Sequence, residues 1–310
     1  MSNLVQRILV ALVAIPLIVA LSMLGGWYFF GFVLLIATLG LHEFYLLMRV
    51  KGLHPHSTLG IVFGTMILIV FFWEKYRLFA AMAFGELGGR VHEANMLHAL
   101  VPLSLVFVFV VLCVELFRGH GSAVMNAAVT VFGAMYVSMF LGSFIGLREL
   151  FASQQIAHGA HLAATEQYNE ADLYRWGGLT IVSVFVSLWM CDSLAYFAGR
   201  FFGKHKLFER VSPNKTWEGA IAGYVGGVAT FLLAQNFLLP YMSVGSAFVC
   251  GSIVGVFGQI GDLVESLIKR DAAVKDSSSL IPGHGGVLDR FDSLMFVAPL
   301  MYLYIRWIVS

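Results

Sequence analysis

The sequence has little charge and little cysteine. Only 12% of its 310 residues are charged, whereas about a quarter of a soluble globular domain is charged. Such a chain cannot bury its apolar surface in a single core, which excludes an ordinary soluble domain. The three cysteines, Cys113, Cys191 and Cys250, all lie in apolar runs, so no disulfide framework is indicated. The net charge of +1 points to no particular partner, and we expect no nucleic-acid polymer to bind.

Apolar sequence takes the place of charge, at 59% of the residues. Several runs reach the about 20 residues that a helix needs to cross a bilayer. They are continuous rather than alternating, which favours helices over a β-barrel, because a backbone in lipid must satisfy its own hydrogen bonds. We therefore predict an all-α, polytopic integral membrane protein with about nine transmembrane helices, and an interfacial or loop segment over 78–95. The expected spans cover residues 8–25, 27–48, 58–73, 97–117, 124–147, 177–198, 219–239, 244–268 and 291–309.

The expected spans divide into two regions. Residues 1–175 form an N-terminal region of about five spans plus an external loop over 150–175. Residues 176–310 form a C-terminal region of about four spans, which holds nearly every dense polar cluster. Lysine and arginine gather on the side of the N-terminus, which the positive-inside rule places in the cytoplasm. Two polar loops, 199–218 and 269–290, are then cytoplasmic, and the C-terminus is outside.

Carboxylates occur inside several expected spans, where ionisable groups are costly and usually functional. They are Glu43, Glu115, Asp192, Asp262 and Glu265. In the orientation above, each lies in the later part of a span that runs from the outside to the inside. We therefore expect carboxylates from four helices to approach the same cytoplasmic membrane face.

The eighth expected span ends in a polar stripe. Asp262, Glu265, Ser266 and Lys269 are spaced so that they share one helix face. An ordinary helix-end ion pair would explain Glu265 and Lys269. It would not explain Asp262, which lies a turn deeper and, as a buried carboxylate, favours a bound cation.

The loop KRDAAVKDSSSLIPGHGGVLDRFD, Lys269 to Asp292, combines acids, bases and glycines. Gly283, Gly285 and Gly286 allow positive φ angles, and such backbone exposes N–H groups that can cradle an anion. His284 lies between glycines with no core around it, which favours a functional role. The bases are Lys269, Arg270, Lys275 and Arg290, and the acids are Asp271, Asp276, Asp289 and Asp292. Capping of the ninth span is the alternative for the last two acids. The set as a whole is what a metal-bound polyphosphate requires.

The other cytoplasmic loop, Gly199 to Gly219, is basic. Its run GRFFGKH resembles a phosphate-binding P-loop but is one residue short and lacks the Ser/Thr, so we reject that interpretation. A serine before Pro213 predicts a turn, or a helix start with serine as N-cap. Capping does not explain why Lys215 and Glu218 lie next to the membrane surface. The residues expected to contact a ligand here are Ser212, Asn214, Lys215, Thr216 and Glu218.

Three blocks of residues carry a resemblance to a known family. They are Asp192-Ser193-x-Ala-Tyr196-x-x-Gly199-Arg200; Ser212-Pro213-Asn214-Lys215-Thr216-x-Glu218-Gly219; and Ser266-x-x-Lys269-Arg270 with Lys275-Asp276, Pro282-Gly-His-Gly-Gly286 and Asp289-Arg290-x-Asp292. Together they resemble the signature of the phosphatidate cytidylyltransferase family, also called CDP-diacylglycerol synthase. The resemblance implies an all-helical, Mg²⁺-dependent homodimer in the bacterial inner membrane, with its N-terminus and active site in the cytoplasm. It would convert CTP and phosphatidate of the inner leaflet to CDP-diacylglycerol and pyrophosphate.

The resemblance also implies roles for the polar residues. The expected metal ligands are Asp262 and Asp289, with Asp192 and Asp276 as nearby support. A second, monovalent cation is left open. The expected phosphate-clamping and catalytic residues are Lys215, Lys269, Arg270, Lys275, His284 and Arg290. The expected substrate-binding residues are Ser212, Asn214, Thr216, Glu218, Gly283, Gly285 and Gly286.

Three other functions compete with this interpretation. A CTP-dependent polyprenol or phytol kinase would use related chemistry at the membrane. A cation-coupled transporter would use Asp192, Asp262 and Glu265 as an ion path, but transport sites usually lie at the midplane between repeats. Here the acids gather at one face and no repeat is visible. A structural scaffold would leave the loop from Lys269 to Asp292 unexplained.

Overall fold

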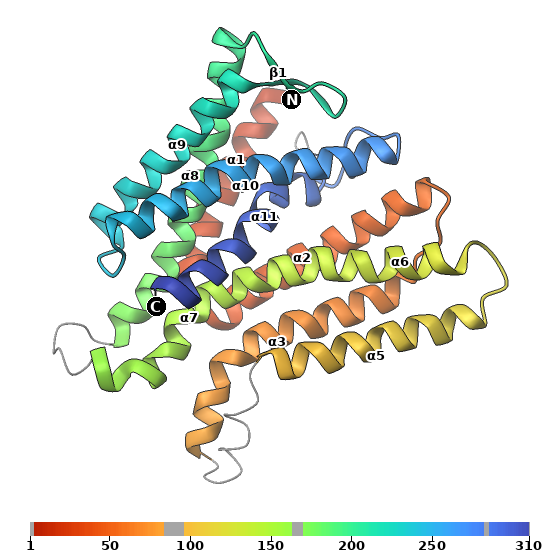
Figure 1. The fold of residues 1–310 in the computed structure, drawn as a ribbon, viewed down its shortest axis with the longest axis horizontal. Helices are drawn as coiled ribbons and strands as arrows, with labels where there is room; N and C mark the ends of the chain where they lie inside the picture. The colour runs from red at the N-terminus through yellow and green to blue at the C-terminus, as the bar shows by residue number, and fades with distance from the viewer. Residues whose placement is uncertain (1–2, 84–95, 163–169, 282–284, 310) are drawn as a thin grey trace. The chain divides into compact units, whose positions relative to one another are not determined.

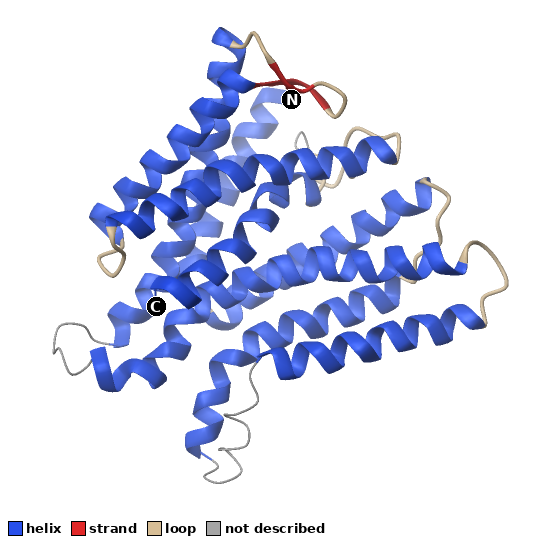
Figure 2. Ribbon diagram, viewed as in Figure 1, coloured by secondary structure: helices blue, strands red, loops and turns tan. Residues whose placement is uncertain are grey.

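The structure is a computed structural model that describes residues 3–83, 96–162, 170–281 and 285–309. Figures 1 and 2 show that the chain is built almost entirely of helices. The helices are α1 (Asn3–Leu24), α2 (Gly26–Val50), α3 (Ser57–Ala83), α5 (Met96–Leu116), α6 (Ala123–Gly133), η1 (Ala134–Met139), α7 (Phe140–Leu162), α8 (Glu170–Phe202), α9 (Trp217–Leu238), α10 (Val244–Asp271), α11 (Leu288–Tyr304) and η3 (Ile305–Val309). A short hairpin is formed by β1 (Lys206–Phe208) and β2 (Ser212–Thr216).

The all-α, polytopic membrane architecture is confirmed. Among the described residues, seven helical segments are long and apolar enough to cross a membrane. Two further apolar helices, Ile8–Leu24 and Ser57–Trp73, are shorter. All nine expected spans coincide with helices except at single end residues, Gly25, Phe117 and Leu239. Among the described residues, only seven helical segments are both long enough and apolar enough for a span, so the expected number of about nine is not confirmed as such.

One predicted loop is largely helical, and the described start of another predicted loop or interfacial segment is helical too. The segment 150–175 was expected as an external loop, yet α7 continues to Leu162 and α8 begins at Glu170. Alanine, leucine, glutamine and glutamate are good helix formers, so the helices extend beyond their apolar runs. The segment 78–95 was expected to be interfacial or loop, but α3 continues to Ala83. Its remaining residues, and those between α7 and α8, lie outside the described part.

The described chain forms two compact units. One comprises Met1–Ser22 with Gly178–Ser310, and the other comprises Met23–Gly177. In the second unit, the adjacent residues Arg148 and Glu149 bind the two sides of the turn between α1 and α2. The Arg148 guanidinium donates to the Met23 carbonyl (3.0 Å), and the Glu149 carboxylate accepts from the Gly26 amide (2.6 Å). Opposite charges thus meet the C-terminal carbonyls of one helix and the N-terminal amides of the next.

The first unit places α10 between α9 and α11 (Figure 1). Close packing there depends on the absence of side chains at particular positions. A Cβ at Gly261 of α10 would lie 2.6 Å from the carbonyl oxygen of Asp292 in α11. Such a distance is not tolerated, so only glycine lets the two backbones approach this closely. The approach brings the neighbouring residue, Asp262, next to the start of α11.

The hairpin corrects a prediction. Ser212 and Pro213 were expected to begin a turn or a helix, but they belong to β2, which pairs antiparallel with β1. Helix α9 begins only at Trp217, and Thr216 caps it by accepting from the Gly219 amide (3.2 Å). Proline has no backbone N–H to donate to a neighbouring strand. In a two-stranded sheet each strand has one unpaired edge, so Pro213 can be accommodated in β2.

Candidate active site

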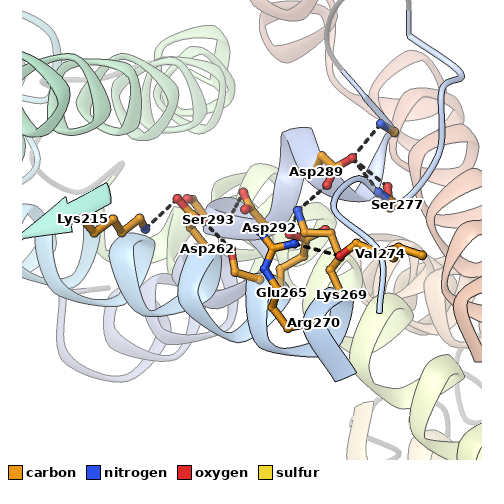
Figure 3. Close-up of polar contacts among 12 residues, drawn as sticks. Lys215, Asp262, Glu265, Lys269, Arg270, Val274, Ser277, Asp289, Asp292 and Ser293 are labelled. Atoms are coloured by element: carbon orange, nitrogen blue, oxygen red, sulfur yellow. Dashed lines mark hydrogen bonds and ion pairs between the residues drawn. The ribbon is translucent and has the colours of Figure 1, made fainter. Parts of the chain in front are cut away.

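A row of charged side chains lies where α10 and α11 meet the hairpin and the loop before α11 (Figure 3). At one end of the row, Lys215 of β2 contacts Asp262 of α10, with 2.6 Å between ammonium and carboxylate. Both side chains are partly exposed, at 24% and 37%. A ligand that reaches this pair can therefore contact both charges.

Three carboxylates from three helices line one cavity in the middle of the site, described below. Asp192 of α8, Asp262 of α10 and Asp292 of α11 interact electrostatically. Capping of the ninth span was the alternative role for Asp292, but Val287 occupies the N-cap position of α11. The sequence carried a usable signal for it, because Asp289 and Asp292 are three residues apart and project on neighbouring turns of one helix.

At the other end of the row, Asp289 holds the loop that precedes α11. Its Oδ1 accepts from the Lys269 ammonium (2.5 Å). Its Oδ2 accepts from the Ser277 amide and hydroxyl (both 3.0 Å) and from the Gly286 amide (2.8 Å). Lys269 also pairs with the buried Glu265, so the helix-end ion pair considered from the sequence is present. Asp289 thus joins three segments of the loop region.

The remaining predicted residues of this loop have four different situations. Arg290 and Asp276 lie at the site, where both line a cavity described below. Arg270 and Lys275 are exposed and are not among the described residues that line it; the Arg270 guanidinium donates to the Val274 carbonyl (2.9 Å). Gly285 has a φ of +78°, as the glycine-rich sequence predicted. Gly283 and His284 lie outside the described residues.

Two cavities meet at this row. The hairpin cavity, about 490 Å³, is lined by α8, the hairpin, α9 and α10, and includes Arg200, Asn214, Lys215 and Thr216. The loop cavity, about 350 Å³, is lined by α8, α10, α11 and the preceding loop, and includes Lys269, Asp276, Asp289, Arg290 and Asp292. Asp192 and Asp262 line both cavities. These two carboxylates therefore form a shared wall of the two cavities, called the junction below.

The predicted residues of the hairpin have different positions. Asn214, Lys215 and Thr216 line the hairpin cavity. Ser212 instead pairs with Phe208 across the hairpin. The Glu218 carboxylate accepts from the Lys204 and His205 amides, and lies 2.7 Å from Nδ1 of His205. Glu218 therefore fixes the start of the hairpin to α9 rather than facing either cavity.

The glycines of the GRFFGKH run lie close to Thr216 of the hairpin. A Cβ at Gly203 would lie 2.2 Å from the Gly199 carbonyl and 2.7 Å from the Thr216 side chain. A Cβ at Gly219 would lie 2.7 Å from the Ala195 carbonyl. The spacing that resembles a P-loop therefore allows α8, the hairpin and α9 to pack closely, which agrees with its rejection from the sequence.

The cytidylyltransferase family model matches residues 5–308. The chain belongs to the cytidylyltransferase family. It is similar to the phosphatidate cytidylyltransferase of Bacillus subtilis, at 33% identity over 97% of each chain. It is also similar to the phosphatidate cytidylyltransferases of a Synechocystis strain, at 31% identity over 97% of this chain and 96% of the relative, and of Staphylococcus epidermidis, at 30% over 95% and 96%. The family resemblance inferred from the sequence is thereby confirmed.

Two acids expected near the site of this cytidylyltransferase belong to the other unit. Glu115 is buried and lies 2.5 Å from His56, 2.9 Å from Asn126 and 3.5 Å from Arg118. Glu43 is buried in α2. Through these contacts Glu115 links the α2–α3 connection to the α5–α6 connection. Its carboxylate therefore stabilises the fold of its own unit.

Among the described residues of the cytidylyltransferase, no three metal-binding side chains are already gathered as a coordination site. The donor chemistry nevertheless fits a hard divalent cation, which prefers carboxylate oxygens. Asp192, Asp262 and Asp292 line one cavity, and the Lys215 ammonium contacts Asp262. A bound cation would relieve the mutual repulsion of these charges.

Proposed function

We propose that this chain transfers the cytidylyl group of CTP to phosphatidate, giving CDP-diacylglycerol and pyrophosphate for phospholipid synthesis. The observation that carries the proposal is the junction of two cavities at Asp192 and Asp262, in a membrane helix bundle of a cytidylyltransferase. A reaction between a lipid and a nucleotide needs two binding spaces that share one reacting point. Membership of the family, whose named relatives act on phosphatidate, supports the same assignment.

The reaction makes specific demands on the site. A phosphate oxygen of phosphatidate attacks the α-phosphorus of CTP, and the bond from that phosphorus to the pyrophosphate oxygen breaks. The second pKa of a phosphate monoester is about 6, so the attacking group is already mostly ionised near pH 7. A strong general base is therefore unnecessary. The protein must instead align the reactants and neutralise their charge.

The basic residues at the junction meet the second demand. Lys215 reaches the hairpin cavity, and Lys269 and Arg290 reach the loop cavity. Lys215 and Lys269 each pair with carboxylates now, and each can transfer hydrogen bonds to phosphate oxygens when substrate displaces those partners. These residues would hold the phosphates in line for attack.

Magnesium is part of the proposal. Asp192, Asp262 and Asp292 would hold it, and Asp276 lies at the wall of the same cavity. When bound, the ion would neutralise the charge of the nucleotide phosphates. Asp289 is the ligand that the resemblance implies beside Asp262, and it would have to exchange Lys269 or the Ser277 donors for the ion. A monovalent second cation stays a prediction.

The cellular setting is also a proposal. We place the enzyme in the bacterial inner membrane, with its N-terminus, the hairpin and the loop before α11 at the cytoplasmic face, because basic residues gather in those segments. CTP and inner-leaflet phosphatidate would meet there. The homodimer that the resemblance implies is carried forward as a prediction, to be checked by the mass of the purified protein in nanodiscs.

The test uses CTP labelled at the α-phosphorus, phosphatidate-containing vesicles and the purified, reconstituted protein. We expect the label to move into chloroform-extractable lipid, and to do so only when Mg²⁺ is present. A CTP-dependent kinase would leave the α-label in CDP and would move a γ-label to lipid. Label that stays in water-soluble nucleotide, with active control enzyme in parallel, would overturn the proposed function.

A further inference from the structure

The two cavities differ in the character of their walls. Besides its polar residues, the hairpin cavity is lined by small and apolar residues, among them Ala195, Tyr196, Leu207 and Ala220. The loop cavity concentrates charge, with five carboxylates and two basic side chains in its lining. Ligands of different chemistry therefore fit the two spaces.

Exposed aromatic residues adjoin, in the sequence, several residues that line the hairpin cavity. Phe201 and Phe202 at the end of α8 are 70% and 71% exposed, and Trp217 at the start of α9 is 55% exposed. Phe208 projects from β1 and is 49% exposed. Aromatic residues at the ends of membrane helices mark the level of the lipid headgroups. Trp217, at the start of α9, therefore favours a position of the hairpin near the level of the lipid headgroups, where lipid phosphates are found.

We propose that the hairpin cavity receives phosphatidate and that the loop cavity receives the metal-bound CTP. This assignment rests on the proposed function and adds which substrate occupies which cavity. The glycerol and upper acyl region of the lipid would lie along Tyr196, Leu207 and Ala220. Its phosphate would reach Lys215 and Arg200, which are the basic groups that line this cavity. The exposed aromatic side chains would hold the hairpin in the bilayer surface.

Charge supports the same division. A lipid phosphate carries up to two negative charges and suits Lys215 and Arg200. It would be repelled by the carboxylates of the loop cavity, such as Asp276 and Asp292. A nucleotide that brings a divalent cation is attracted by the same carboxylates, while Arg290 and Lys269 face its phosphates.

The reaction then takes place at the junction. The lipid phosphate oxygen comes from the hairpin side, the α-phosphorus comes from the loop side, and Asp192 and Asp262 lie between them. The new bond joins the lipid oxygen to the α-phosphorus, and pyrophosphate leaves into the loop cavity with the electron pair of the broken bond. Attack and departure thus lie on opposite sides of the phosphorus, as in-line displacement requires.

The decisive variant is Leu207→Trp, which fills the hairpin cavity, with Phe208→Trp as the matched control. Leu207 lines the cavity, whereas the next residue on the same strand projects outward and is exposed. We expect Leu207→Trp to raise the KM for phosphatidate at least tenfold in mixed micelles, and Phe208→Trp to leave it within twofold. Equilibrium binding of labelled CTP with Mg²⁺, without lipid, should be unchanged in both.

A reciprocal variant and a second filling variant complete the kinetic test. Arg290→Gln, in the loop cavity, should weaken CTP binding at least tenfold and leave the KM for phosphatidate within twofold. If Leu207→Trp does not give a folded protein by size exclusion, Ala220→Leu fills the same cavity from α9. Weakened CTP binding in either filling variant, with unchanged phosphatidate KM, would overturn the assignment.

Photolabelling tests the lipid position without catalysis. A phosphatidate analogue with a diazirine near the glycerol should label peptides of residues 195–220. Labelling confined to Phe185, Leu188, Trp189 and Leu294, which line the loop cavity, would contradict the proposal. If the wild-type protein labels at 195–220 but transfers no cytidylyl group, the proposed function fails while the lipid site stands. If it transfers the group but labels elsewhere, only the cavity assignment fails.

Discussion

Changing Asp289 to asparagine separates an anchor of the loop from a ligand of the metal. The present carboxylate accepts from Lys269, from two donors of Ser277 and from Gly286. Asparagine keeps one acceptor oxygen but loses the charge. Hydrogen bonds to charged groups contribute roughly 1.5–3 kcal/mol each, of which the remaining oxygen recovers a part. We call the loop closed when Asp289 holds it at Ser277 and Gly286. We therefore expect the substitution to destabilise this closed conformation by about 2 kcal/mol.

The destabilisation of the loop predicts how far kcat falls. If catalysis needs the closed loop, about 2 kcal/mol corresponds to a roughly 30-fold lower kcat, because 1.36 kcal/mol is tenfold. As an anchor, Asp289→Asn should leave the Mg²⁺ concentration for half-maximal rate within twofold. Asp292→Asn removes one of the three facing carboxylates and should raise that concentration at least tenfold. The measurement is transfer of α-labelled CTP to lipid across a Mg²⁺ titration.

Two controls make the comparison decisive. Asp271→Asn makes the same chemical change at an exposed residue near the end of α10 and should leave kcat and the Mg²⁺ requirement unchanged. Thermal unfolding in nanodiscs should show Asp289→Asn less stable than Asp292→Asn. A normal melting temperature together with a raised Mg²⁺ requirement in Asp289→Asn would refute the anchor and make this residue a metal ligand.

Three further outcomes follow from the contacts. Lys215→Ala should lower kcat/KM for phosphatidate roughly 10- to 100-fold, because Lys215 lines the hairpin cavity and its ammonium contacts Asp262. An unchanged kcat/KM in the lipid-transfer assay would mean that Lys215 has a structural role. Glu218→Gln should lower kcat/KM for phosphatidate by about tenfold and make the hairpin more sensitive to limited proteolysis, because it weakens the hydrogen bonds from the Lys204 and His205 amides. Equal proteolysis of the variant and the wild-type protein would argue against this role of Glu218. Glu115→Gln should lower the melting temperature by several degrees and leave both KM values alone, since its contacts stay within the other unit; a changed KM would show that it acts on the site.

The sequence by itself determined the class of protein and most of the residues at the site. Continuous apolar runs leave helices as the solution in lipid, and all of the expected spans are helical. The i, i+3, i+4, i+7 spacing placed Asp262 and Lys269 on one face of α10, where the structure has both. The gapped motifs indicated the family before any comparison, because so many charged and glycine positions do not recur together by chance.

Tertiary structure decided what each of these residues contacts. Asp292 belongs with Asp192 and Asp262 because Gly261 lets α11 approach α10, and no local pattern reports that approach. The segment from Ser212 became a strand because it pairs with β1, which overrides its weak tendency to start a helix. Contacts between residues distant in sequence depend on how helix surfaces fit together, and so the division of the site into two cavities appears only in the folded chain.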